Sequence, residues 1–103
     1  MMSEPVVTVA QLIDRALAAH AVLTQLGETI SDEWQYVTDL GTVWRARMAA
    51  VAAARGGEAS TPATIDAFAA LAAEAARITD PHKAIDWLST LPQVALLALG
   101  EAA

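Results

Sequence analysis

The sequence predicts an all-α protein, an up-and-down four-helix bundle that ends in a short, Pro-kinked C-terminal helix. Of the 103 residues, 25 are alanine, which loses no side-chain entropy on entering a helix. Apolar residues recur at helical spacing, and no long stretch alternates apolar and polar residues as a strand would. Short connections separate these stretches and favour antiparallel neighbours. The length fits one domain, residues 1–103.

The first helix is predicted over residues 9–26. Thr8 is a suitable N-cap, Gln11 completes a capping box, and Gly27 supplies a left-handed residue to end the helix. A histidine, His20, lies within its apolar face. We expect His20 to be a core residue with one ring nitrogen hydrogen-bonded, and a ligand-binding histidine is the alternative. The other residues of this face are Val9, Leu12, Ile13, Ala16 and Leu23.

The second helix, predicted over residues 31–55, is the longest and holds most of the aromatic residues. Ser31 is its N-cap, and Gly56 and Gly57 follow its end. Large apolar residues cover about 180° of its circumference, more than the roughly 100° of a helix packed on one side. These residues include Trp34, Tyr36, Val37, Leu40, Val43, Trp44, Met48 and Val51. This helix is therefore predicted either to be the most central one or to face a second subunit.

A glycine in the middle of this second helix, Gly41, costs up to about 1 kcal/mol relative to alanine. Such a residue indicates that something approaches the backbone closely. We expect that another helix packs closely against this glycine.

Two helices beginning at prolines follow, predicted over residues 62–78 and 81–90. Pro62 and Pro81 take the first helical position, where the missing amide hydrogen would be unpaired in any case. The first of the two carries a narrow apolar stripe between many alanines, so it needs cover on one side only. This stripe consists of Ile65, Phe68, Leu71, Ala75 and Ile78.

The last predicted helix spans residues 92–99. Pro92 is expected to kink or divide the helix before it, and Gly100 to end this one. Large apolar residues surround this segment and leave it no polar face: Val94, Leu96, Leu97 and Leu99. It requires cover, either in a groove of its own subunit or from a second subunit.

Composition narrows the function classes. Twelve acidic residues against six basic ones give a net charge of −6, which argues against binding to nucleic acid or to anionic lipid. Cysteine is absent, which excludes disulfides and thiol chemistry. The acidic N-terminus is unlike a secretion signal, and no apolar run approaches the roughly 20 residues of a membrane span. We expect a cytoplasmic protein that contacts neither membrane nor nucleic acid.

No motif indicates catalysis, a metal or a cofactor. The glycine pair at 56–57 lacks the strand and the Lys-Ser or Lys-Thr pair of a phosphate-binding loop. The Glu-x-x-His motif of helical metal centres is absent too. The sequence therefore favours a non-enzymatic protein without cofactor, metal or catalytic residues.

The leading prediction is a small acidic helical module for protein–protein interaction. We expect it to self-associate, most simply as a homodimer, and another protein is a possible second partner. Trp, Tyr and Arg are enriched at interface hot spots, and the second helix carries Trp34, Tyr36, Trp44 and Arg47. The residues predicted to form the interface are Trp34, Tyr36, Val43, Arg47, Leu96 and Leu99.

Two alternatives remain open. A ligand-binding or regulatory bundle would hold a small apolar or anionic molecule between its helices, near Trp44 and His20. An acidic inhibitor or antitoxin would instead cover the basic surface of another protein. The role of Arg45 and Arg47, a basic pair without a carboxylate three or four residues away, is not determined by the pattern.

Overall fold

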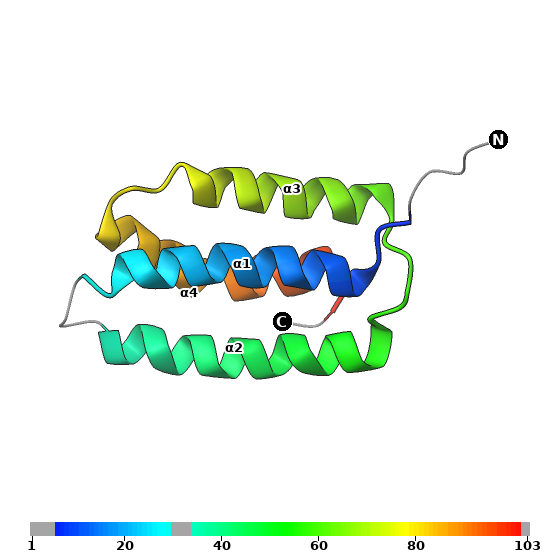
Figure 1. The fold of residues 1–103 in the computed structure, drawn as a ribbon, viewed down its shortest axis with the longest axis horizontal. Helices are drawn as coiled ribbons and strands as arrows, with labels where there is room; N and C mark the ends of the chain where they lie inside the picture. Colours follow the sequence, from blue (N-terminus) through cyan, green and yellow to red (C-terminus); the bar gives the residue numbers. More distant parts are fainter. Residues whose placement is uncertain (1–5, 30–33, 102–103) are drawn as a thin grey trace.

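The computed structural model describes residues 6–29 and 34–101, without the side chains of residues 34–38 and 40. Within this part the chain forms four helices and no strand, which confirms the predicted all-α bundle. The helices are α1 (Val9–Gly27), α2 (Trp34–Arg55), α3 (Pro62–Ala76) and α4 (Pro81–Ala98). Successive helices run in opposite directions (Figure 1).

The bundle is centred on the pair α1 and α4. Each of these helices contacts the other three, whereas α2 packs only against α1 and α4 to any extent. In Figure 1, α4 lies behind α1, with α2 and α3 on opposite sides of this pair. The alternative that the wide apolar arc makes α2 the most central helix is therefore wrong, and α2 forms one edge of the molecule.

The core lies along the α1–α4 pair. Its main cluster joins side chains from all four helices, and a second, smaller cluster lies near the end of α1 and the start of α4. The predicted apolar faces of α1 and α3 point into these clusters. The largest side chains that are almost fully buried are Leu12, Ile13, Leu23, Met48, Leu91 and Val9.

The predicted capping box at the start of α1 is present. The Thr8 side chain accepts a hydrogen bond from the Gln11 amide, and the Gln11 side chain accepts one from the Thr8 amide. The next two amides, of Val9 and Ala10, donate to the carbonyls of Glu58 and Gly56 in the α2–α3 loop. Because these amides lack partners within the helix, the loop completes the start of α1.

The predicted starts of α3 and α4 are also confirmed. Thr61 caps α3 and Asp80 caps α4, each directly before a proline at the first helical position. Helix α3 ends at Ala76, two residues earlier than predicted. The prediction that Ser31 caps the second helix lies outside the described residues.

The predicted left-handed ending at Gly27 is wrong. Gly27 belongs to α1, and the chain leaves the helix through Glu28 in the right-handed conformation, with the Glu28 amide bonded to the Thr24 carbonyl at 3.0 Å. Among the described residues only Gly100 has a positive φ, of 78°. The last turn of α1 thus stays helical through its glycine.

The predicted division into separate helices over residues 81–90 and 92–99 is wrong as well, because α4 runs without interruption from Pro81 to Ala98, with Pro92 inside it. Gly100 ends it as expected. The amide of Gly100 donates to the Leu97 carbonyl, and the amide of Glu101 donates to the Leu96 carbonyl. This pair of bonds is a Schellman ending, which requires the left-handed conformation found at Gly100.

Candidate functional site

An apolar groove of about 360 Å³ runs between α2 and α4. We call it the α2/α4 groove. Its walls are Val43, Trp44 and Arg47 from α2, and Ser89, Pro92, Gln93 and Leu96 from α4. Four of these residues, Val43, Trp44, Arg47 and Leu96, were singled out from the sequence. The structure brings them together because residues three and four apart share a face of α2.

The groove combines buried apolar side chains with an exposed rim. Trp44 and Leu96 are 2% and 6% exposed, so both belong to the core, whereas Val43 is 71% exposed. Arg47 is the one charged side chain among the lining residues. The groove therefore offers an apolar surface with a single positive charge and no carboxylate.

The outer face of α2 continues this apolar surface. Helical projection places Ala46, Ala50 and Ala53 opposite the buried Trp44, Met48 and Val51, and all three are exposed, as is Val43 on the flank beside the groove. Residues 48–54 contain no polar side chain at all, over almost two turns. An edge helix normally directs polar residues to water. This part of α2 is therefore apolar all round, whereas the outer face before it carries the exposed Asp39 and Thr42.

His20 and Trp44, predicted to share a pocket, pack against each other in the core. Their rings are stacked with centroids 4.7 Å apart and planes inclined by 29°. His20 is 3% exposed, and its Nδ1 lies 3.4 Å from the Thr24 hydroxyl. Gly41 is the point of close approach on α2, since a Cβ there would lie 3.0 Å from Cε1 of His20. The group that packs closely against Gly41 is thus the His20 ring of the neighbouring helix α1.

The environment of His20 favours its neutral form. Burial, and to a lesser extent the positive charge of Arg45, lower the pKa of His20 to about 4. Of the two stacked residues, Trp44 lines the α2/α4 groove, and His20 is not among the residues that line it.

The other predicted interface residues are not part of the groove. Leu99 is 5% exposed and lies beyond the end of α4, where it contributes to the core. Leu96 and Leu99 are thus covered by their own chain, which leaves little of either side chain for a second subunit. The side chains of Trp34 and Tyr36 lie outside the described part of the structure.

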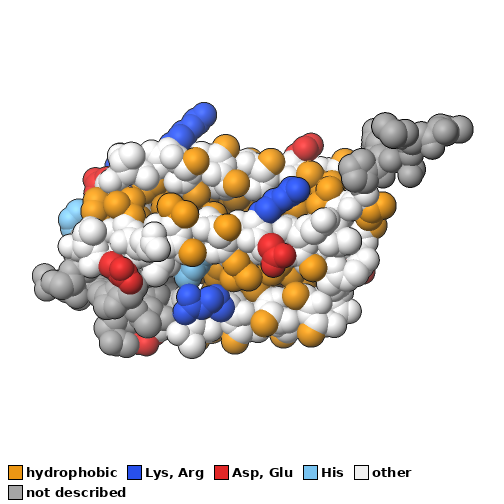
Figure 2. Space-filling view, viewed as in Figure 1, with side chains coloured by type: hydrophobic (Ala, Val, Ile, Leu, Met, Phe, Trp, Pro, Cys, Tyr) orange, Lys and Arg blue, Asp and Glu red, His pale blue; other side chains and the backbone are white. Residues whose placement is uncertain are grey.

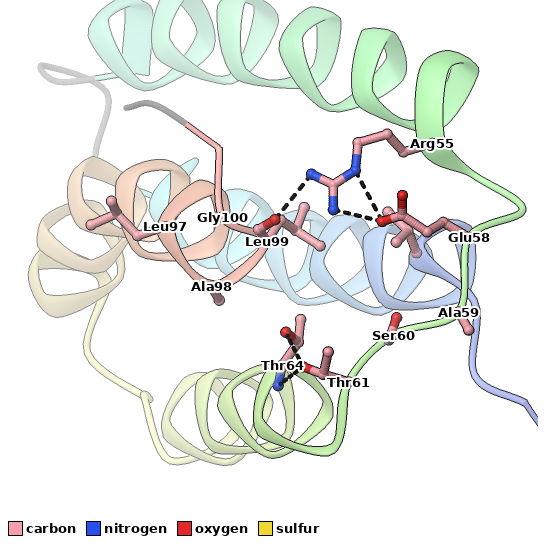
Figure 3. A pocket seen from close by; sticks show the side chains of 11 residues that line it. Arg55, Glu58, Ala59, Ser60, Thr61, Thr64, Leu97, Ala98, Leu99 and Gly100 are labelled. Carbon is pink, nitrogen blue, oxygen red and sulfur yellow. Dashed lines mark hydrogen bonds and ion pairs between the residues drawn. The ribbon is translucent and has the colours of Figure 1, made fainter.

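A second cavity, of about 250 Å³, lies at the end of the bundle where the α2–α3 loop meets the end of α4 (Figure 3). Arg55 points into it and donates to the Glu58 carboxylate at 2.7 Å, the Leu99 carbonyl at 3.0 Å and the Glu101 carboxylate at 2.9 Å. The bonds to the two carboxylates, first that of Glu58 and then that of Glu101, raise the pKa of Arg55. Arg55 therefore ties the chain end to the loop, and its donors are already engaged.

A third hollow, of about 370 Å³, lies between α1 and α3. It is lined by Arg15, Ala18, Ala19, Val22, Ala72, Ala75 and Ala76. Figure 2 shows apolar side chains along this seam. Val22 is 63% exposed, and the sequence pattern did not single it out. The signal was weak, because one valine among alanines does not distinguish an exposed position from a buried one.

In the described part of the chain, no group of three or more His, Asp or Glu side chains is arranged to hold a metal ion. None of the helices described is both long enough and apolar enough to cross a bilayer.

Comparison of the chain with protein-family models, with curated proteins and with solved structures finds no match.

Proposed function

We propose that this chain is a small helical protein–protein interaction module that self-associates through the outer face of α2 and the α2/α4 groove. The observation that carries the proposal is the uncovered apolar surface of an edge helix. Val43 is 71% exposed beside the Trp44 wall of the groove, and residues 48–54 offer water no polar side chain. Packing a second helix there would remove this surface from water, the main driving force of association.

The net charge of −6 on each copy opposes self-association, so the apolar contact must outweigh this repulsion, and association should strengthen as salt screens the charge. The alanines of α2 allow a partner helix to approach to the short end of the usual 8–10 Å between helix axes.

Light scattering coupled to gel filtration tests the proposal. We expect a molar mass above 10.8 kDa, the mass of one chain, that rises with the concentration loaded. A mass equal to one chain at every concentration up to about 1 mM would contradict self-association, because a dissociation constant above that range corresponds to less than about 4 kcal/mol of binding.

A second candidate function is the binding of a small amphipathic anion in the same groove. Trp44 and Arg47 line it together, and its volume of about 360 Å³ falls in the usual range of small-ligand sites. A titration with octanoate, followed by thermal shift, tests this reading. We expect stabilisation that the Arg47→Gln variant loses, and no shift at millimolar octanoate would count against it.

A further inference from the structure

The outer face of α3 has a charge pattern that is its own complement. Phe68, Leu71 and Ala75 are the buried residues of this helix. At about 100° per residue, the positions opposite them fall on one line along the helix. This line consists of Asp66, Ala70, Ala73 and Arg77, and all four residues are exposed.

The two charges of this line have opposite signs and lie at its two ends. Eleven residues separate Asp66 from Arg77, about 16 Å along the axis at 1.5 Å per residue. Neither side chain takes part in an ion pair or a side-chain hydrogen bond within residues 6–29 and 34–101. Between them the line carries only alanine, so nothing bulky prevents a second helix from lying against it.

We infer that α3 packs antiparallel against α3 of a second copy of this chain, about a two-fold axis between Leu71 and Ala72. This axis places Asp66 opposite the partner's Arg77, and Arg77 opposite the partner's Asp66. Ala70 then meets the partner's Ala73. Both ion pairs form at once, because a two-fold interface uses each contact twice.

The charges select a second copy over other partners. A parallel copy would bring like charges together at both ends, and an antiparallel copy pairs all four. A single pair of helices buries less than the roughly 800 Å² per partner of a stable complex, so the dimer is weak and forms at high chain concentration. The surface lies on the side of the α1–α4 pair opposite α2, so it is separate from the surface of the proposed function (Figure 1).

Charge exchange tests the inference in the Val43→Glu background, which removes association through α2, with dimerisation measured by sedimentation equilibrium at high chain concentration. Added to this parent, Asp66→Arg and Arg77→Asp each place like charges at both contacts, and we expect each to raise the dissociation constant about tenfold or more. The combination of the two changes restores opposite charges and should dimerise like the Val43→Glu parent. The Asp66→Arg and Arg77→Asp proteins, when mixed, should form a heterodimer, because each supplies the charges that the other lacks.

A disulfide provides an independent readout, since the chain has no native cysteine. Ala70→Cys mixed with Ala73→Cys should give an oxidised heterodimer faster than either variant alone. Ala70→Cys mixed with Ala18→Cys on α1 is the matched control.

Two outcomes would overturn the inference. One is that Asp66→Arg and Arg77→Asp each dimerise like the Val43→Glu parent, and the other is that their combination is as weak as either change alone. These outcomes leave the proposed function untouched, because that proposal depends on the surface of α2 and is tested by a change at Val43.

Discussion

At the scale of single residues, the most consequential contact is the stack of His20 on Trp44. The ring of His20 is held between Trp44 and the bare backbone of Gly41, with its Nδ1 near the Thr24 hydroxyl. The sequence placed His20 on an apolar face and predicted that some group packs closely against Gly41. It could not show that this group is the His20 ring, because that depends on how α1 and α2 align.

The buried histidine makes stability depend on pH. The pKa of His20 is lowered to about 4 from an ordinary value of 6.5, so the unfolded chain binds the proton more readily. The stabilisation is complete above pH 6.5 and is lost as the pH falls from 6.5 to 4. We expect the loss to total no more than about 3 kcal/mol, measured by urea unfolding between pH 7 and pH 4.

Two variants isolate this effect from the carboxylates that titrate in the same range. His20→Phe keeps an aromatic ring and should flatten the profile between pH 6.5 and pH 5. His82→Gln, which changes the exposed histidine of α4, should leave it unchanged. An unchanged profile in His20→Phe would show that another group is responsible.

A methyl group at Gly41 should destabilise the protein. Alanine gains up to about 1 kcal/mol in helix propensity, but its Cβ would lie 3.0 Å from His20 Cε1 and 3.1 Å from Nε2. The His20 ring cannot move away, because Trp44 stacks on it. Since overpacking costs about 1–3 kcal/mol, we expect Gly41→Ala to lower the free energy of unfolding by about 1 kcal/mol.

The matched control is Gly27→Ala, also in a helix, where the added Cβ would lie 3.4 Å from Cγ1 of Ile85, an ordinary contact. It should be neutral or stabilising in the same chemical unfolding assay. A Gly41→Ala protein more stable than the wild type would mean that the ring has room to move.

At the scale of elements, α4 continues through Pro92 because tertiary packing outweighs the local cost. The buried side chains Leu88 and Leu91 before the proline and Ala95 and Leu96 after it share one face, so a break would remove half of this face from the core. In the preceding turn, the Ser89 and Thr90 hydroxyls donate to carbonyls four residues back. Local preference alone gave the wrong prediction here.

Pro92→Ala should stabilise the chain. It restores an amide that can donate to the Leu88 carbonyl and removes the ring from the helix interior, where proline costs about 3 kcal/mol. Allowing for lost groove contacts, we expect a gain of about 1–2 kcal/mol in thermal unfolding. Pro81→Ala is the control, and we expect it not to stabilise the chain, because the first position of a helix accepts proline well. A less stable Pro92→Ala protein would contradict this account.

Helix starts were the most predictable part of the fold. Thr8, Thr61 and Asp80 cap their helices by side-chain bonds to amides two or three residues away, so local sequence suffices to find them. The ending at Gly27 was not predictable in this way, because a glycine permits a left-handed turn without requiring one.

At the scale of the whole molecule, the order of packing was not predictable. The wide apolar arc of α2 left open whether this helix is central or faces a second subunit, and the structure places the α1–α4 pair at the centre instead. The pattern reports how much apolar surface a helix carries, and not which neighbours cover it. Accordingly Val43, Trp44 and Arg47 were found from the sequence, whereas the burial of Leu96 and Leu99 by their own chain was not.

The central claim is that the uncovered face of α2 mediates association. The most direct test compares Val43→Glu with Val22→Glu, two exposed valines of different helices, by molar mass at equal concentration. At concentrations below those at which the weak α3 pair forms, we predict that the wild type and Val22→Glu associate and that Val43→Glu approaches the 10.8 kDa of one chain. Equal masses for the two variants, or a wild type that is monomeric throughout, would contradict the account.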